Sequence, residues 1–358
     1  MAENAKGTEL TKQQLLDMLR RMWEIRLFED KVYDLLGQNI IKGASHLYAG
    51  QEAVAVGAVQ ALRDDDLITS THRGHGHCHA RGDILAEGAE AKQTHLNRMM
   101  AELCGRVTGY CAGRGGSMHI ADVEKGNLGA TGIVGGNIPV ATGAALSMKM
   151  QATDRCVVCF FGDGASNTGN FHESLNMAAA WKLPVVYVVE NNLYGMSVPF
   201  DSVSPMSDIA ARAAAYDMPG VVVDGMDPIA IYEAVGAALE RARRGDGPAL
   251  VECKTYRWYG HSRSDPRKYR TKDEEGQWRA RDPLVVFGKH LLEAGIVTQA
   301  ELDAVEERAV EAIEVATEFA LASPMPPAED VEKDVYVLKA PTPAEIEAER
   351  RLRMRVRA

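Results

Sequence analysis

The chain has 358 residues, of which 46% are hydrophobic, so it can bury the core of a large globular domain with additions. Its formal net charge of −10 argues against a nucleic-acid groove or an anionic membrane surface as the main partner. The sequence contains no run of about 18 apolar residues, which argues against a membrane-spanning helix.

The N-terminal segment has the pattern of an amphipathic helix from Leu10 to Gln38. Apolar residues recur between charged ones at helical spacing, namely Leu15, Met18, Leu19, Met22, Trp23, Leu27 and Phe28. We therefore predict a helical segment over residues 1–44 whose role is packing. The start, MAENAKGTELTKQQ, lacks the apolar core of a secretion signal and the arginine-rich character of a transit peptide. We expect a cytoplasmic protein.

Residues 45–282 are predicted to form one α/β domain. Helical stretches rich in glycine and alanine alternate with short β-branched runs, which are RCVVCFFGDG, LPVVYVVENN, PGVVVDG and PALVECKTYRWYG. This alternation predicts a parallel sheet with helices on both faces, and such sheets bind ligands at the carboxyl ends of their strands. Cys156 and Cys159 fall on opposite faces of one buried strand, which favours two core thiols over a redox or zinc pair.

The pattern becomes helical again over residues 283–358, in HLLEAGI and in ELDAVEERAVEAIEVATEFALA. A proline-containing break at SPMPPAED precedes a charged tail that ends in RRLRMRVRA. We predict a helical C-terminal extension, with a tail that is solvated or, less commonly, docks a partner.

Polar residues follow two neighbouring strands of the predicted sheet. Asp163 lies in a GDG turn after one strand, and Asn192 ends the next. Both strand ends open on the same edge of a parallel sheet, so these side chains can converge. A carboxylate, an amide oxygen and the backbone carbonyl of Tyr194 form an oxygen set suited to Mg²⁺. Gly164 and Ala165 are predicted to open a helix whose amino end favours a diphosphate.

The stretch GDGASNTGNFHESLNMAAAWKLPVVYVVENN resembles the thiamine-diphosphate signature, in detail that of the α subunit of the E1 component of 2-oxo acid and acetoin dehydrogenase complexes. The resemblance runs roughly from Met22 to Asp282, through HLYAGQEAVAVG, THRGHGH, GYCAGRGGSMHIAD, GIVGGNIPVATGAAL and YGHSRSDPRKYR. It implies a thiamine-diphosphate-binding fold with thiamine diphosphate and Mg²⁺ as cofactors.

The resemblance also implies roles for individual residues. The metal would be held by Asp163, Asn192 and the backbone of Tyr194. The implied cofactor-binding residues are His72, Arg73, Gly132, Val134, Asp163, Gly164, Ala165, Asn192 and His261. The implied catalytic residues are His261, near the phosphate and the reacting centre, and His46, facing the substrate.

Four of the ten histidines lie in the short stretch THRGHGHCHA, at His72, His75, His77 and His79. A zinc site would need three or four converging ligands. Gly74 and Gly76 favour a loop here, and Arg73 would repel a cation, so diphosphate and substrate binding is favoured over zinc. His77 and His79 either belong to that site or are only structural.

The implied reaction is cleavage of a C–C bond by thiamine diphosphate, with transfer of the acyl group to the lipoyl arm of an E2 acyltransferase. The activating glutamate is implied to belong to a β subunit, in an α2β2 heterotetramer, so the lone chain is expected to be inactive. Acetoin is the favoured substrate and pyruvate the close alternative. Branched-chain 2-oxo acids, a catalytically silent assembly subunit and a zinc hydrolase built on the histidines remain open.

The segment HSRSDPRKYR follows the last predicted strand and is polar and basic. It is predicted to be a mobile loop that orders over bound diphosphate, the alternative being an ordinary surface turn. Ser262 matches a serine that is phosphorylated in animal relatives, although nothing in this sequence shows a kinase for it.

Overall fold

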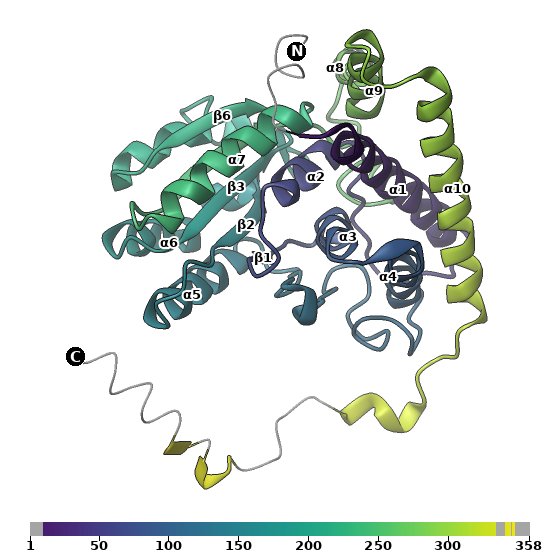
Figure 1. Cartoon of the computed structure of the whole chain (residues 1–358), viewed down its shortest axis with the longest axis horizontal. Coiled ribbons are helices and arrows are strands. Elements are labelled where there is room, and N and C mark those ends of the chain that lie inside the picture. Colours follow the sequence, from purple (N-terminus) through teal and green to yellow (C-terminus); the bar gives the residue numbers. More distant parts are fainter. Residues whose placement is uncertain (1–9, 334–340, 345, 348–358) are drawn as a thin grey trace.

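The computed structural model describes residues 10–333, 341–344 and 346–347. Its centre is a parallel sheet of five strands in the order β1-β2-β3-β7-β6 (Figure 1). In chain order the strands are β1 (Leu67–Thr69), β2 (Val157–Gly162), β3 (Val185–Asn191), β6 (Gly220–Asp224) and β7 (Ala249–Lys254). This confirms the predicted α/β class.

Helices cover both faces of the sheet (Figure 1). One face packs against α2 (Glu52–Gln60) and α7 (Pro228–Arg243), and the other against α5 (Asn137–Met150) and α6 (Gly169–Ala180). Each face has its own apolar core because side chains alternate along a strand. Cys156 belongs to one core and Cys159 to the other, and both are free thiols, as predicted.

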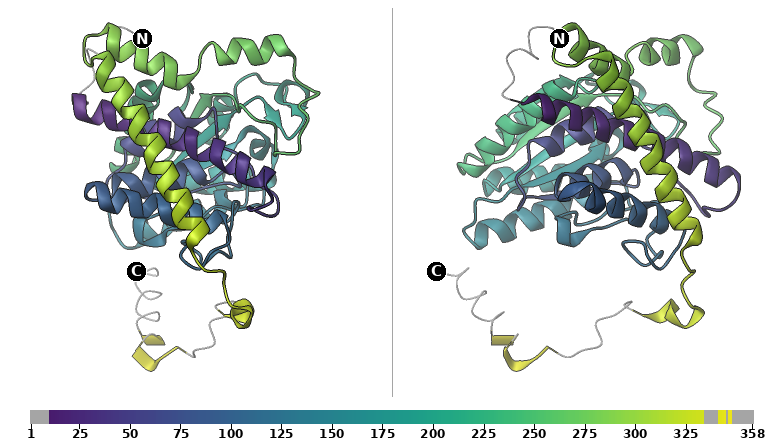
Figure 2. Two further views of the ribbon diagram at one scale, coloured as in Figure 1. Left: turned by 90° about the vertical axis from the view of Figure 1, so that its right-hand side faces the viewer. Right: turned by 45° about the vertical axis from the view of Figure 1, so that its right-hand side comes forward.

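The terminal helices are joined to this framework. α1 (Lys12–Gly37) begins at a capping box formed by Thr11 and Gln14, and its buried side chains enter the same core as the sheet. After α8 (Lys272–Arg279) and α9 (Pro283–Glu293), the long α10 (Gln299–Ala322) crosses α1 and α4 (Gly88–Leu103) (Figure 2). The predicted helical extensions are thus present, while the charged tail lies outside the described residues.

Short elements connect the main ones. The hairpin of β4 (Tyr194–Gly195) and β5 (Val198–Pro199) follows β3. The 3₁₀ helices are η1 (Val123–Lys125), η2 (Asp163–Asn167), η3 (Phe200–Ser202), η4 (Ile209–Tyr216) and η5 (Ala328–Glu332). Gly164 and Ala165 therefore lie in a 3₁₀ turn, and α6 begins only at Gly169, which corrects the predicted helix start.

The predicted histidine-rich loop is wrong from residue 75 onward, because α3 (His75–Ile84) begins there. Gly76 does not break this helix. A Cβ atom at that position would lie 2.3 Å from Cδ1 of Tyr48, so the glycine is needed for the close approach of an aromatic ring. The glycine is therefore explained by close packing against Tyr48, and it does not mark a loop.

The sheet ends at β6, whose outer edge has no neighbouring strand among the described residues. Val221 and Val222 in this strand are 42% and 44% exposed, unlike the buried strands β2 and β3. Within the described part of the chain, none of the helices has the length and apolar character needed to cross a membrane.

Candidate active site

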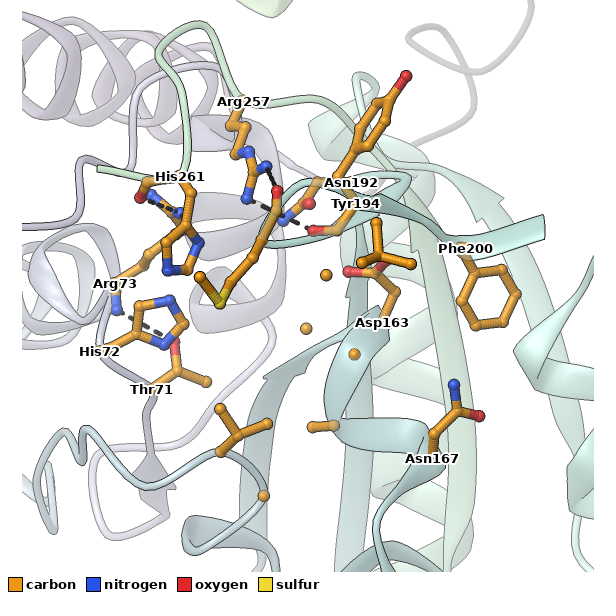
Figure 3. Close-up of a pocket in the computed structure, with 18 of the residues that line it drawn as sticks. Thr71, His72, Arg73, Asp163, Asn167, Asn192, Tyr194, Phe200, Arg257 and His261 are labelled. Atoms are coloured by element: carbon orange, nitrogen blue, oxygen red, sulfur yellow. Dashed lines mark hydrogen bonds between the residues drawn. The ribbon is translucent and has the colours of Figure 1, made fainter. Parts of the chain in front are cut away.

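A cavity of about 590 Å³ opens at the carboxyl ends of the strands (Figure 3). The predicted site residues that line it are His72, Arg73, Val134, Asp163, Gly164, Ala165, Asn192, Tyr194 and His261. Two predicted residues do not line the cavity. Gly132 lies between two lining residues in the chain, and His46 packs edge-on against the ring of His72. The structure therefore brings the predicted residues to one edge of the sheet, as parallel topology requires.

Two buried oxygens face this cavity without a hydrogen-bond partner among the described residues. They are Oδ2 of Asp163, a side chain only 2% exposed, and Oδ1 of Asn192, which is 5% exposed. Nδ2 of Asn192 donates to Oε1 of Gln51 at 3.0 Å, so the amide oxygen is turned the other way. Burial raises the pKa of Asp163 to about 6. Buried oxygens of this kind are costly unless a ligand pairs with them.

A third oxygen comes from the backbone of Tyr194. The phenol of this residue donates to Oε2 of Glu274 at 2.7 Å and so leaves the cavity, where only the main chain remains (Figure 3). Arg257 Nη1 lies 3.4 Å from the Tyr194 carbonyl oxygen, a long contact that leaves a lone pair available. Leu193 and Met196 have φ values of 73° and 55°, which produce the tight turn around this carbonyl.

Two buried arginines, Arg73 and Arg257, bring positive charge to the cavity. Arg73 is 3% exposed, and its guanidinium donates to the carbonyl oxygens of Leu47 at 2.8 Å and His261 at 2.6 Å. Arg257 is 2% exposed and donates to the carbonyl oxygens of Tyr194 and Met196 and to the Tyr269 hydroxyl. Among the described residues, neither arginine donates a hydrogen bond to a carboxylate. Two buried cations without an acidic partner are suited to bind an anion.

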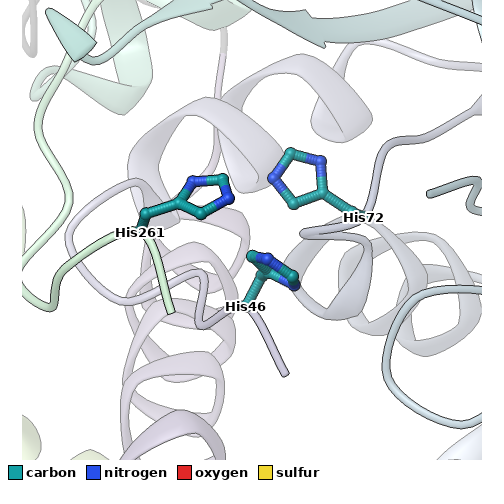
Figure 4. A group of neighbouring side chains, drawn as sticks. All are labelled: His46, His72 and His261. Carbon is teal, nitrogen blue, oxygen red and sulfur yellow. The ribbon is translucent and has the colours of Figure 1, made fainter. Parts of the chain in front are cut away.

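The rings of His46, His72 and His261 cluster together (Figure 4). Ring centroids lie 4.6 Å apart for His46 and His72, and 4.7 Å apart for His46 and His261. Burial and the Arg73 charge lower the pKa of His46 to about 3, of His72 to about 2 and of His261 to about 4. All three rings are therefore neutral near pH 7.

The cluster also has the spacing of a metal site, since its ligand atoms lie within 4.8 Å of one another. However, Nη2 of Arg73 lies 3.3 Å from Nδ1 of His261. A guanidinium at this distance repels a cation for the same reason that it lowers the histidine pKa values. The chemistry of the cluster therefore suits a carboxylate or phosphate better than zinc.

Residues 20–329 match the family model described as dehydrogenase E1 component. This chain belongs to that family. It is 51% identical over 333 residues to the α subunit of acetoin:2,6-dichlorophenolindophenol oxidoreductase from Bacillus subtilis (strain 168), covering 93% of this chain and 96% of the relative. It is 40% identical over 336 residues to the pyruvate dehydrogenase E1 component subunit α from Rhizobium meliloti (strain 1021), covering 93% of each chain.

Sequence reasoning missed Arg257 and Gln51 in this E1 chain. Arg257 follows β7 and donates to the carbonyl oxygen of Met196 as well as to the Tyr194 carbonyl. Arg257 and His261 both follow β7, so the position of Arg257 at this edge of the sheet could also have been predicted from the sequence. Gln51 contacts Asn192 across 141 positions of sequence, and no local pattern reports such a contact.

The other histidines of THRGHGHCHA turn away from the cavity into the core. His75 Nδ1 lies 2.8 Å from Oε1 of Glu29, and His79 Nε2 lies 2.9 Å from Oε2 of Glu24. His77 lies between Oε1 of Glu190, at 3.0 Å, and the hydroxyl of Ser70, at 2.8 Å. Each of the three thus has a buried glutamate partner.

The predicted mobile loop is tied down in this structure. The Asp265 carboxylate accepts from the backbone N–H of His261 at 2.6 Å and from the Tyr269 hydroxyl at 2.5 Å. Arg270 stacks over the ring of Tyr256, with its guanidinium carbon 4.3 Å from the ring centroid. These contacts fix His261 at the mouth of the cavity, and mobility of the loop stays a prediction.

Proposed function

We propose that this chain is the α subunit of an E1 component that cleaves a C–C bond of acetoin or pyruvate. The acyl group and its electron pair then pass to the lipoyl disulfide of an E2 acyltransferase. Membership of the E1 family implies thiamine diphosphate as the cofactor and a complex with a β subunit and E2. The observation that carries the proposal is the pair of unpaired oxygens, on Asp163 and Asn192, facing one cavity with Arg73.

The donor set fits the cofactor. The Asp163 carboxylate, the Asn192 amide and the Tyr194 carbonyl are hard oxygen donors of the kind that hold Mg²⁺. Arg73 and Arg257 supply the positive charge that a diphosphate requires. When bound, thiamine diphosphate supplies the carbanion that attacks the substrate carbonyl and stores the electron pair after cleavage.

The remaining walls exclude water and bring the substrate to the reaction. Apolar side chains also line the cavity, namely Ile133, Val134, Met196, Val198, Phe200 and Val203. His261 and His46 are neutral, so each can donate or accept a hydrogen bond at the substrate oxygen. We propose His261 as a proton-transfer residue and His46 as a substrate-binding residue.

The cavity lacks the acid that should activate the cofactor. Among the residues that line it, Asp163 is the only carboxylate, and it belongs to the metal donors. This supports an activating glutamate from the β subunit, with the site at an interface of an α2β2 heterotetramer. Ile133 and Val134 at the cavity are 71% and 55% exposed, which is consistent with a partner surface. A cytoplasmic location is part of the same proposal.

Acetoin is the first choice of substrate because the relatives named for acetoin are 51% and 44% identical, against 40% for a bacterial pyruvate dehydrogenase subunit. A branched-chain 2-oxo acid remains an alternative substrate. The complete set of oxygen donors argues against a silent assembly subunit. The Arg73 charge argues against a zinc hydrolase.

Calorimetric titration of thiamine diphosphate, with and without Mg²⁺, tests the site in the α–β complex. Asp163→Ala and Asn192→Ala should abolish Mg²⁺-dependent binding, because a strictly octahedral ion cannot easily replace a lost ligand. Asp303→Ala, at an exposed position of α10, is the matched control and should bind normally. Unchanged affinity in both site variants would refute the assignment.

The reaction is tested by dye reduction with acetoin and with pyruvate. The α chain alone should give no turnover, and activity should appear on mixing with the β subunit. The substrate with the higher kcat/KM identifies the branch of the family. Robust turnover by the lone chain would contradict the proposed interface site.

A further inference from the structure

A buried polar chain connects α1 to the residue before His46. Nδ1 of His75 lies 2.8 Å from Oε1 of Glu29, and Nε2 of His75 lies 2.9 Å from the hydroxyl of Ser117 and 3.0 Å from its carbonyl oxygen. The Ser117 hydroxyl in turn lies 2.8 Å from the hydroxyl of Ser45. All four residues of this chain, which we call the serine relay, are at most 7% exposed.

The two middle residues of the serine relay are anchored. Phe28 packs edge-on against the His75 ring, with centroids 5.9 Å apart. The loop before Ser117 is held by Glu102, whose carboxylate accepts four backbone N–H bonds, from Cys111, Gly113, Gly115 and Gly116. The relay is therefore a fixed element rather than a chance contact on a surface.

The direction of the hydrogen bonds follows from the glutamate. A carboxylate on Nδ1 fixes which nitrogen of His75 carries that proton, and so turns Nε2 toward Ser117. Ser117 is held by Nε2 on one side and can hold Ser45 on the other. The position of Ser45 is thus set from α1 through three successive contacts.

His46 needs such support because its own ring is weakly held. Its Nδ1 is buried and has no hydrogen-bond partner in the described part of the chain. The ring packs edge-on against those of His72 and His261 (Figure 4). Its place at the cavity is therefore determined mainly by the backbone, and the neighbouring residue Ser45 is the point where that backbone is tied.

We propose that Glu29, His75, Ser117 and Ser45 are positioning residues that hold His46 in the orientation required by the substrate. The inference rests on the proposed function, because only there does His46 act on a substrate. The inference goes beyond that function because it assigns the orientation of His46 to residues that lie outside the cavity. Loss of the relay should affect substrate use, while the metal and diphosphate residues keep their places.

The chain offers a matched control for this proposal. His79 and Glu24 form the same kind of buried pair between the same two helices, at 2.9 Å. That pair continues to Arg20 and Asp83 instead of to the cavity. Changes in the control pair should therefore affect stability without affecting the orientation of His46.

The test uses the α–β enzyme with Ser45→Ala, Ser117→Ala and the double variant. Each single change should lower kcat/KM for acetoin, or for pyruvate if that is the better substrate, by about 10- to 100-fold, as expected for a displaced substrate group. Calorimetric affinity for thiamine diphosphate should remain as in the wild type. The double variant should lose no more than the worse single one, because both changes break the same contact. Ser117→Thr, which keeps the hydroxyl, should restore most of the rate.

Wild-type kcat/KM in both serine variants, additive losses in the double variant or an equal loss in His79→Gln would overturn the proposal. A second readout needs no turnover. The imidazole NMR signal of His46, assigned through its loss in His46→Gln, should shift in Ser45→Ala and stay in place in His79→Gln; an unmoved signal in Ser45→Ala would also overturn the relay. If the wild type shows no turnover but the signal shifts as expected, the proposed function fails while the relay stands.

Discussion

Two groups of histidines meet at the start of α3, and their surroundings are opposite. The cavity group, His46, His72 and His261, lies beside arginines and includes buried nitrogens that have no partner among the described residues. The core group, His75, His77 and His79, has a glutamate for every ring. His72 and all three rings of the core group come from one stretch of sequence, yet only their partners distinguish a residue that builds the core from one left free for a ligand.

The difference has an energetic basis. Burying a polar group without a partner costs stability, whereas a paired group recovers most of that cost. The cavity group lowers the stability of the fold in order to keep neutral imidazoles at the site. The core group fixes α3 against α1 and β3, which in turn determines where His72 lies.

The largest effect is expected for His261→Ala, from the cavity group. It should lower kcat by about 10²-fold or more, the size typical of a positioned proton-transfer or electrostatic group. The melting temperature should change little, because the imidazole is only half-buried. Two roles of His261, proton transfer and loop ordering, can be separated by measuring the rate of dye reduction and the rate of acyl transfer to the lipoyl domain. Loss only in lipoyl transfer would indicate loop ordering, and normal rates in both assays would remove His261 from the site.

His79→Leu, from the core group, should have the opposite outcome. The free energy of unfolding should fall by about 2 kcal/mol, less than for a fully broken buried pair because Arg20 still contacts Glu24. kcat/KM per folded molecule should remain as in the wild type. Chemical denaturation followed by circular dichroism gives the first quantity. A large loss of activity without a loss of stability would abolish the distinction between the two groups.

The smallest effect concerns pH and His72. Burial, and then the charges of Arg73, His46, His261 and Arg257, lower its pKa to about 2, whereas an unfolded histidine titrates near 6.5. Below about pH 6.5 the unfolded chain binds a proton that the folded chain does not, so stability falls as the pH is lowered from 7 to 5. The contribution is at most about 2 kcal/mol at pH 5.

His72→Gln removes this titration, so its melting temperature should fall less between pH 7 and pH 5 than that of the wild type. His172→Gln, at an exposed position of α6, serves as the control and should follow the wild-type curve. Parallel curves for wild type and His72→Gln would mean that this ring is not held neutral by its surroundings.

Much of the fold was predictable because β2, β3, β6 and β7 begin as runs rich in β-branched and other apolar residues and are bounded by turns. β1 was not, since three residues are too few to show a pattern. The helix at His75 was missed for a different reason. The fit of the Tyr48 ring against Gly76 is a long-range contact, and from sequence alone a glycine reads as a break.

The same distinction between local sequence patterns and long-range contacts applies to the site. Asp163, Asn192 and His261 could be placed together because strand ends share an edge in any parallel sheet. The hydrogen-bond partner of Asn192 could not be predicted, because Gln51 reaches it through packing between segments 141 positions apart. Topology is encoded locally, whereas the orientation of a side chain depends on the completed core.

The open edge of the sheet has a consequence for handling the protein. β6 is the outermost strand and carries Val221 and Val222 at roughly half exposure, so backbone donors and acceptors lie beside an apolar surface. Edges of this kind are templates for strand addition by another chain. In a concentrated preparation of the isolated subunit, the first aggregates should grow from this edge. Producing the chain together with its partner shortens the time for which free subunits can associate in this way.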